Sequence, residues 1–346
     1  MRCGDFRTSY EADMAVFESP LARWSLLALI AFLCALPLFA TTYWLDVANR
    51  VGIAVVAAMG LNILTGFTGQ ISLGNAAFLA VGAYTTAALT ARGVSFLIAI
   101  PASGLVSALV GMVFGIPSLR LKGLYLAMAT LAAHFIVEFT AAHWEGVTGG
   151  VAGISIASPR LFGLDLDNDR SLYCLILPVA IFHLWFAKNL FRTRVGKAFV
   201  AVRDQDISAE VMGVDVFRYK LLAFAVSSFY VGVAGSLLAY QSKIVSPENF
   251  PLSVAIDHLG MIIIGGLGSV LGSILGAAFI TLLPEILRLT TSLLGGSFPT
   301  LIQIFAALKL GVFGLTIVLF LVFEPDGMAA RWRKIKNYWT LYPFSY

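Results

Sequence analysis

The sequence predicts an all-α fold, a polytopic transmembrane helical bundle of about eight to ten spans. Of its 346 residues, 59% are hydrophobic and only 12% are charged, whereas soluble domains have about 25% charged residues. The mean hydropathy is +0.88. Apolar runs of about 20 residues recur, which is the length that crosses a hydrocarbon core of roughly 30 Å. The alternating pattern of a transmembrane β-barrel is absent.

The apolar runs follow one another with short polar connections. They cover roughly residues 24–44, 47–64, 71–91, 94–116, 123–142, 171–188, 220–241, 252–266, 269–288 and 300–323. The run at 252–266 is short for a crossing, and 300–308 also fits an interfacial position with Lys309 at the boundary. The runs divide the chain into an N-terminal segment (1–23), a transmembrane domain (24–328) and a C-terminal tail (329–346). We interpret the first run as a retained helix, because a good signal-peptide cleavage site does not follow it.

Basic residues in short connections predict the orientation, because such connections stay in the cytoplasm. Arg120 and Lys122 lie in one connection, a polar insert at 188–220 contains seven Lys and Arg, and the tail after the last run contains four more basic residues. All three sites fall on one side if there are ten crossings. We therefore expect both termini in the cytoplasm, and the loop 143–170 outside.

Composition and motifs argue against several classes of protein. Cys3, Cys34 and Cys174 are scattered, which predicts neither a disulfide framework nor a metal site. The net charge of +4 reflects basic membrane loops rather than a nucleic-acid-binding surface. No catalytic, metal-binding or Walker A motif is present, so we expect no catalytic residues, no metal and no ATP hydrolysis by this chain.

Two Gly-rich segments, 60–75 and 260–272, depart from ordinary spanning helices. Irregular backbone at membrane depth is tolerated where protein or a water-filled cavity covers it, and transporters use such broken helices in equivalent halves to line a substrate path. In the first segment we expect a translocation path, because each polar group there needs a partner or water. Its polar residues are Thr65, Thr68, Gln70, Ser72 and Asn75.

In the second segment we favour close helix packing. Gly268, Gly272 and Gly276 form two overlapping GxxxG motifs, which bring helix backbones together. Gly111 and Gly115 repeat that spacing.

Ionisable residues inside the runs are few, and each is a candidate for function. They are the pairs His134 with Glu138, Asp257 with His258, and Glu285 with Arg288. The alternative interpretation is structural: Glu285 and Arg288 pair at an interface, Glu138 is solvated near the outer end, and Asp257–His258 lies at a helix entrance. No chain of carboxylates suggests a proton relay.

Several motifs, in order, resemble the inner-membrane permeases of the branched-chain amino acid ABC transporter family. They are GLNILTGFTGQISLGNAAFLAVGAYTTA (60–87), GIPSLRLKGLYLAMATLA (115–132), TGGVAGI (148–154), the stretch from Arg192 to Leu237, IIIGGLGSVLGSILGAAFITLLPEILR (262–288) and LFLVFEPDGM (319–328). The similarity covers roughly residues 45–328, and the RYKLLAF junction resembles the larger, LivM-type partner of the two permeases.

The resemblance implies a bacterial inner-membrane importer of branched-chain amino acids. It implies three kinds of partner besides membrane lipid: a second homologous permease, two ATP-binding-cassette ATPase subunits that use ATP-Mg, and an extracytoplasmic substrate-binding protein. It implies no cofactor on this chain. Similar permeases serve urea and short amides, so that substrate class remains an alternative. An ion-coupled secondary carrier is the alternative of a different class, and a membrane-embedded enzyme or a channel fits less well.

The resemblance also implies that the 188–220 insert contains a coupling helix that contacts the ATPase. The residues expected to do so are Arg203, Asp204, Ile207, Ser208, Ala209, Glu210, Met212 and Gly213. The sequence Ser-Ala-Glu-Val-Met-Gly departs from the clean EAA pattern of ABC importers. From the residues alone, we predict that Asp204 N-caps a short helix, that Gly213 ends it in the left-handed conformation, and that Ile207, Val211 and Met212 are its apolar anchors.

Overall fold

The computed structural model of the chain describes residues 20–118, 121, 123–161, 164–165, 167–294 and 299–341. The described part is almost entirely helical. Its longer helices are α2 (Pro20–Phe39), α3 (Thr42–Asn62), α4 (Asn75–Ala91), α5 (Phe96–Ser118), α6 (Leu124–His143), α8 (Asp169–Leu190), α9 (Arg194–Asp204), α11 (Val216–Ser242), α12 (Leu252–Gly265), α13 (Val270–Leu294), α14 (Pro299–Phe323) and α15 (Gly327–Leu341). Its shorter elements are η1 (Ile63–Phe67), α7 (Glu145–Thr148), η2 (Gly150–Ala152), β1 (Ile154–Ser155), β2 (Arg160–Leu161), β3 (Leu164–Asp165), α10 (Asp206–Val211), β4 (Ile244–Val245) and η3 (Pro247–Asn249).

Every predicted apolar run corresponds to a helix, which confirms the all-α membrane bundle. Six described helices are long and apolar enough to cross a membrane, or seven if the pair Gly311–Phe323 and Gly327–Tyr338, bent by 46°, forms one span. The predicted eight to ten also counted α2, whose apolar part is only Arg23–Phe39, and two shorter helices, α4, with 17 residues, and α12, with 14. Both are shorter than the roughly 20 residues of a full crossing, because each begins only after an irregular segment.

Helices α3 and α11 form the centre of the bundle. Within their spanning windows 78% of α3 and 67% of α11 is buried, whereas the other spanning helices are less than half buried. Helix α11 packs against α3, α4 and α5, and α3 also packs against α8, α12 and α13. The fully buried side chains Met59, Phe224 and Tyr230 lie in this core.

Small residues allow the helix backbones to touch. A Cβ on Gly82 of α4 would lie 2.1 Å from the carbonyl oxygen of Gly232 on α11. On the other side of the bundle, a Cβ on Gly276 of α13 would lie 1.8 Å from the carbonyl oxygen of Met261 on α12, and one on Gly272 would lie 2.5 Å from that of Gly266. Since two polypeptide backbones occupy this space, only glycine fits.

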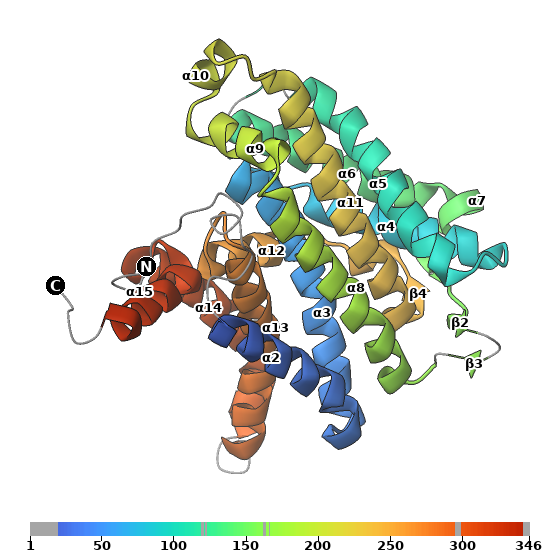
Figure 1. Cartoon of the computed structure of the whole chain (residues 1–346). Coiled ribbons are helices and arrows are strands. Elements are labelled where there is room, and N and C mark those ends of the chain that lie inside the picture. Colours follow the sequence, from blue (N-terminus) through green and yellow to red (C-terminus); the bar gives the residue numbers. More distant parts are fainter. Residues whose placement is uncertain are drawn as a thin grey trace.

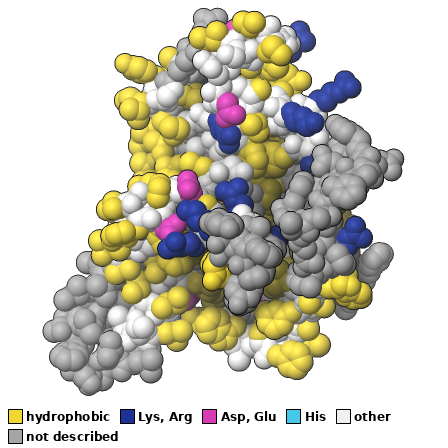
Figure 2. All heavy atoms as spheres, turned by 60° about the vertical axis from the view of Figure 1, so that its left-hand side comes forward, with side chains coloured by type: hydrophobic (Ala, Val, Ile, Leu, Met, Phe, Trp, Pro, Cys, Tyr) yellow, Lys and Arg dark blue, Asp and Glu magenta, His cyan; other side chains and the backbone are white. Residues whose placement is uncertain are grey.

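The two ends of the bundle differ. Helices α9 and α10 lie at one end, and the small β-ribbons lie at the other (Figure 1). Strand β1 pairs antiparallel with β4, which joins the loop after α6 to the segment after α11. On the face shown in Figure 2, hydrophobic side chains predominate and charged ones form a few small groups. Such a surface suits contact with lipid or with another membrane subunit.

Close packing at Gly276 predicts a sharp difference between two glycine substitutions. Gly276→Ala should destabilise the protein by about 1–3 kcal/mol or more, because the added methyl group overlaps a backbone carbonyl. The measurement is the midpoint of thermal unfolding in detergent. Gly311→Ala is the matched control, since a Cβ there meets nothing within 4 Å, and its midpoint should stay near that of the wild type. Equal midpoints for the two variants would contradict the packing argument.

Candidate functional site

The backbone after α3 departs from a regular helix, and hydrogen bonds that a regular helix would not make hold this break in place. The chain passes from α3 into the π-helical turn η1 and then runs without regular structure to α4. The Thr65 hydroxyl donates to the carbonyl of Gln70 over 3.1 Å, and the Thr68 hydroxyl donates to that of Ile63 over 2.9 Å. π-Helical turns occur frequently at functional sites.

The polar residues predicted to line a path are buried at this break. Thr65, Thr68, Gln70, Ser72 and Asn75 are each at most 9% exposed. The Gln70 amide donates to the carbonyl of Lys220 at the start of α11, the Ser72 hydroxyl accepts from the amide of Gly74, and Asn75 Nδ2 lies 2.8 Å from His258 Nδ1. In this conformation they bind the protein itself, and a path role stays a prediction.

Asn62 connects the two Gly-rich segments. Its Nδ2 donates to the carbonyl of Ser269 over 2.9 Å and to the hydroxyl of Ser273 over 2.7 Å. Its Oδ1 accepts from the amide of Gly268 over 2.9 Å. Sequence reasoning missed this residue, although a fully buried asparagine in an apolar run is itself a signal. The side chain fixes the end of α3 against the start of α13.

Arg203 reaches the same junction from the end of α9. Its Nη1 donates to the carbonyl of Gly66 in η1 over 3.1 Å, and a Cβ on Gly268 would lie 3.1 Å from this nitrogen. Its Nε and Nη2 donate to Asp204 Oδ1. The guanidinium therefore joins the surface element α9 to the broken helix.

A cleft of about 290 Å³ lies beside this contact. Its lining includes Thr68 and Gln70 from the break, Arg203 and Asp206 from the α9–α10 segment, and Lys220 from α11. Lys220 Nζ lies 3.5 Å from Asp206 Oδ2. Two of the predicted path residues thus share a polar cleft with the predicted coupling segment, a juxtaposition that the sequence did not reveal.

Helix α10 begins one residue later than an Asp204 N-cap would place it, so the proposed Asp204 N-cap is wrong. Asp204 is the last residue of α9, and its carboxylate is bound by Arg203; the N-cap position of α10 is Gln205. At the other end, Gly213 has φ +85° and its amide donates to Glu210, while that of Val214 donates to Ala209. These two bonds form a Schellman motif, which requires a left-handed residue at Gly213.

The outer face of α10 is apolar. Ile207 is 66% exposed, Val211 82% and Met212 83%. Ser208, Glu210 and Gly213 are exposed as well, whereas Ala209 is buried. Large exposed aliphatic side chains are costly in water, so this face is suited to contact with another protein.

Two of the three predicted ionisable pairs lie within ion-pair distance in the structure. Arg288 Nε lies 3.2 Å from Glu285 Oε2, and Tyr43 donates to the same carboxylate. His134 Nε2 lies 3.5 Å from Glu138 Oε2, in a pocket described below. Among the described residues no group of three or more His, Cys, Asp or Glu could hold a metal ion. Cys34 and Cys174 are free, and Cys3 lies outside the described residues.

The loop between α6 and α8 is tied to the end of α11. Gly149, Gly150 and Gly153 in the TGGVAGI motif have φ between 61° and 73°, which favours glycine. Lys243 donates to Asp167 Oδ1 over 2.6 Å, and the Ser158 hydroxyl donates to the same oxygen over 2.5 Å. These two bonds hold the pKa of Asp167 below the ordinary value of 3.8 for an aspartate.

A bundle of membrane helices with a broken central span is an arrangement that membrane transporters use. The family model for the branched-chain amino acid transport system permease component matches residues 43–321. The chain belongs to this family, and it is a permease subunit of an ABC importer rather than an enzyme. It is a multi-pass inner-membrane protein and itself binds no cofactor. The ion-coupled carrier considered from the sequence is thereby set aside.

Individual relatives agree with this family. The LivM permease of the high-affinity branched-chain amino acid system of Salmonella typhimurium is 34% identical over 288 residues, which cover 76% of this chain and 68% of the relative. The LivM permease of Escherichia coli is 32% identical, over 90% of this chain and 76% of the relative. The autoinducer 2 import permease LsrC of Klebsiella pneumoniae is 29% identical, over 49% of each chain. No solved structure matched the chain.

The two hydrogen bonds to Asp167 predict that its pKa will rise when either donor is removed. The bonds stabilise the loop at pH values above the Asp167 pKa, and this stabilisation should be lost as the pH falls through that pKa. Lys243→Met should raise the titration midpoint of Asp167 more than Ser158→Ala does, because Lys243 contributes a charge as well as a hydrogen bond. Carbon NMR of the Asp167 carboxyl measures the midpoint. A midpoint unaffected by Lys243→Met would contradict this assignment.

Proposed function

We propose that this chain is one of two different permeases in an ATP-driven importer of branched-chain amino acids. The observation that best supports the proposal is the family match over residues 43–321 together with LivM relatives at 32–34% identity. In this proposal the other partners are two ATPase subunits, which use ATP-Mg, and an extracytoplasmic binding protein. A permease for urea or short amides is the alternative within the same family.

The proposed orientation places α9, α10 and both termini in the cytoplasm. The basic residues of the 188–220 insert and of the tail support it. The loop at 143–170 then faces the binding protein. The residues directly after α11 face it as well, because the pairing of β1 with β4 and the ion pair of Lys243 with Asp167 join them to the loop. The docking surface for the ATPase would be the exposed aliphatic face of α10.

The proposed mechanism is alternating access between two packings of the helices. ATP closes the ATPase pair, and α10 transmits the movement through α9 and Arg203 to the carbonyl of Gly66. Because this bond reaches the broken helix directly, a displacement of α9 changes the hydrogen bonding at the break. ATP and the loaded binding protein must each favour one of the two packings, since a ligand shifts an equilibrium only by its differential affinity.

Reconstitution of the complete complex tests the function. We expect proteoliposomes with both permeases and both ATPases to take up radiolabelled leucine only with the binding protein outside and ATP-Mg on the ATPase side. The same vesicles with a non-hydrolysable ATP analogue are the control. Uptake of urea or acetamide in place of leucine would support the alternative substrate class. Leucine uptake by the chain alone under an ion gradient would overturn the proposal.

Two changes in the insert should separate docking from coupling. Replacing Ile207, Val211 and Met212 together by serine should weaken ATPase association about tenfold or more, because apolar anchors dominate such interfaces. Deleting 203–213 should abolish it. Arg203→Gln should leave association intact but lower leucine uptake per ATP hydrolysed, since the bond to Gly66 is lost. Pull-down and coupled uptake and ATPase assays provide the measurements.

Each change has a matched control. Ile244→Ser removes another exposed isoleucine, at the opposite end of the bundle, where it is 53% exposed. Arg218→Gln removes an exposed arginine of the same insert that pairs with Asp215 on the surface. Wild-type ATPase affinity in the triple variant would refute the docking role, and unchanged uptake per ATP in Arg203→Gln would refute the coupling role.

A further inference from the structure

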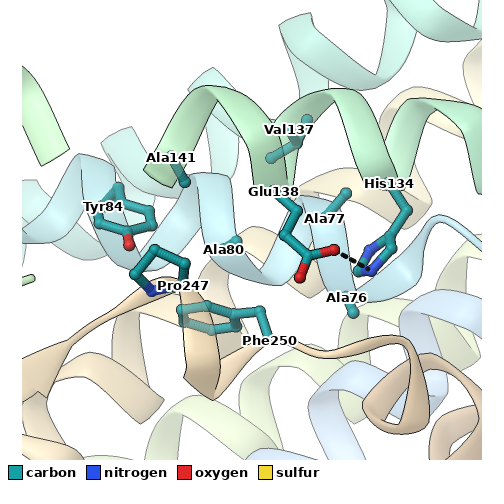
Figure 3. A pocket seen from close by; sticks show the side chains of 10 residues that line it. All are labelled: Ala76, Ala77, Ala80, Tyr84, His134, Val137, Glu138, Ala141, Pro247 and Phe250. Carbon is teal, nitrogen blue, oxygen red and sulfur yellow. Dashed lines mark ion pairs between the residues drawn. The ribbon is translucent and has the colours of Figure 1, made fainter. Parts of the chain in front are cut away.

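A small pocket lies between α4, α6 and the segment that precedes α12. Figure 3 shows Tyr84 and three alanines entering from α4, His134, Val137, Glu138 and Ala141 from α6, and Pro247 and Phe250 from the third segment. The pocket is separate from the α9–α10 contact described above. It combines three polar groups with walls that are otherwise apolar.

The polar groups of this pocket are buried and poorly satisfied. Tyr84 is 7% exposed and its hydroxyl has no hydrogen-bond partner. His134 is 1% exposed, neither ring nitrogen has a hydrogen-bond partner, and Nε2 lies at an ion-pair distance of 3.5 Å from Glu138. Buried polar groups are normally paired, because leaving them unpaired costs free energy. Two such residues beside the Glu138 carboxylate of the same pocket therefore indicate a ligand.

Glu138 makes the pocket unusual for a membrane helix. Its side chain is 41% exposed although it lies within the spanning helix α6, where an ionised carboxylate is costly unless it finds a partner or water. A ligand cation would supply that partner. The first turn of α4 borders the same pocket through Ala76 and Ala77, and the positive end of a helix dipole favours an anion.

On the basis of the proposed import of amino acids, we propose that this pocket is a transport subsite for the zwitterionic head group of an α-amino acid. Glu138 accepts hydrogen bonds from the substrate ammonium group. The Tyr84 hydroxyl and a ring N–H of His134 donate to the substrate carboxylate. Val137 and Phe250 supply the apolar surface for an aliphatic side chain. A neutral amide or urea has no charge for Glu138 to bind.

The subsite is closed in this conformation. The remaining space is about 10 Å³, which is room for about one water molecule. Tyr84, Val137 and Ala141 also line an apolar cleft of about 550 Å³ between α4, α5 and α6. A shift of these three side chains would join the two spaces, so a modest repacking of α4 against α6 opens the subsite. Closure in one packing is what alternating access requires.

The test uses the complete importer with its binding protein. Glu138→Gln and Tyr84→Phe should each lower ATP-dependent leucine uptake about tenfold or more, as expected when a hydrogen bond to a charged group is lost. Binding-protein-stimulated ATP hydrolysis and complex assembly should stay within about twofold of the wild type, which excludes misfolding. Asp326→Asn, which changes an exposed acid between α14 and α15 and outside the pocket, is the matched control and should transport normally.

A photoreactive diazirine analogue of leucine locates the substrate directly. During turnover of the wild type it should label peptides that contain Tyr84 or Val137, and Glu138→Gln should abolish that labelling. If the wild type imports leucine but both variants do so equally well, or the label lies elsewhere, the subsite is refuted while the proposed function stands. If the wild type imports urea or acetamide and not leucine, both proposals are overturned.

Discussion

An interrupted helix inside an apolar bundle must have its backbone polar groups satisfied by protein, and the arrangement around η1 depends on this constraint. The carbonyl of Gly66 is bound by Arg203, and the amide of Gly268 is bound by Asn62. Thr65 and Thr68 bond carbonyls within the break itself. If these bonds were absent, two Gly-rich segments would expose unpaired backbone at membrane depth.

The same bonds join elements that would otherwise be independent. Asn62 fixes α3 to the start of α13, and Arg203 connects that junction to the surface helix α9. Lys220 accepts a hydrogen bond from Gln70 through its carbonyl and pairs with Asp206 through its ammonium group, so α10 and α11 meet the break as well. A small displacement of the α9–α10 segment would therefore shift residues at the centre of the bundle, because close-packed interiors transmit strain.

The sequence predicted the helices better than it predicted their contacts. Hydropathy located each of the long apolar helices but not α9, α10 or α15, because the length of an apolar run is a local property. Glycine spacing indicated the close approach of α12 and α13, which the short Cβ distances at Gly272 and Gly276 now explain. Arg203 with Gly66 and Asn62 with Gly268 could not be predicted, since these pairs are separated by 137 and 206 residues. The Asp204 cap was wrong because Asp204 is the last residue of α9 and its carboxylate binds Arg203.

Two groups of polar residues in the bundle behave differently, and the difference bears on where a substrate passes. Thr65, Thr68 and Asn75 at the break have their hydrogen bonds with backbone or with a neighbouring side chain, so in this conformation they have a structural role. Tyr84 and His134 are equally buried but lack hydrogen-bond partners. Folding satisfies the three residues of the first group without a ligand, whereas Gln70 Oε1 at the same break has no hydrogen-bond partner. In our proposal the second group binds a ligand, because an apolar residue at either position would cost less free energy of folding.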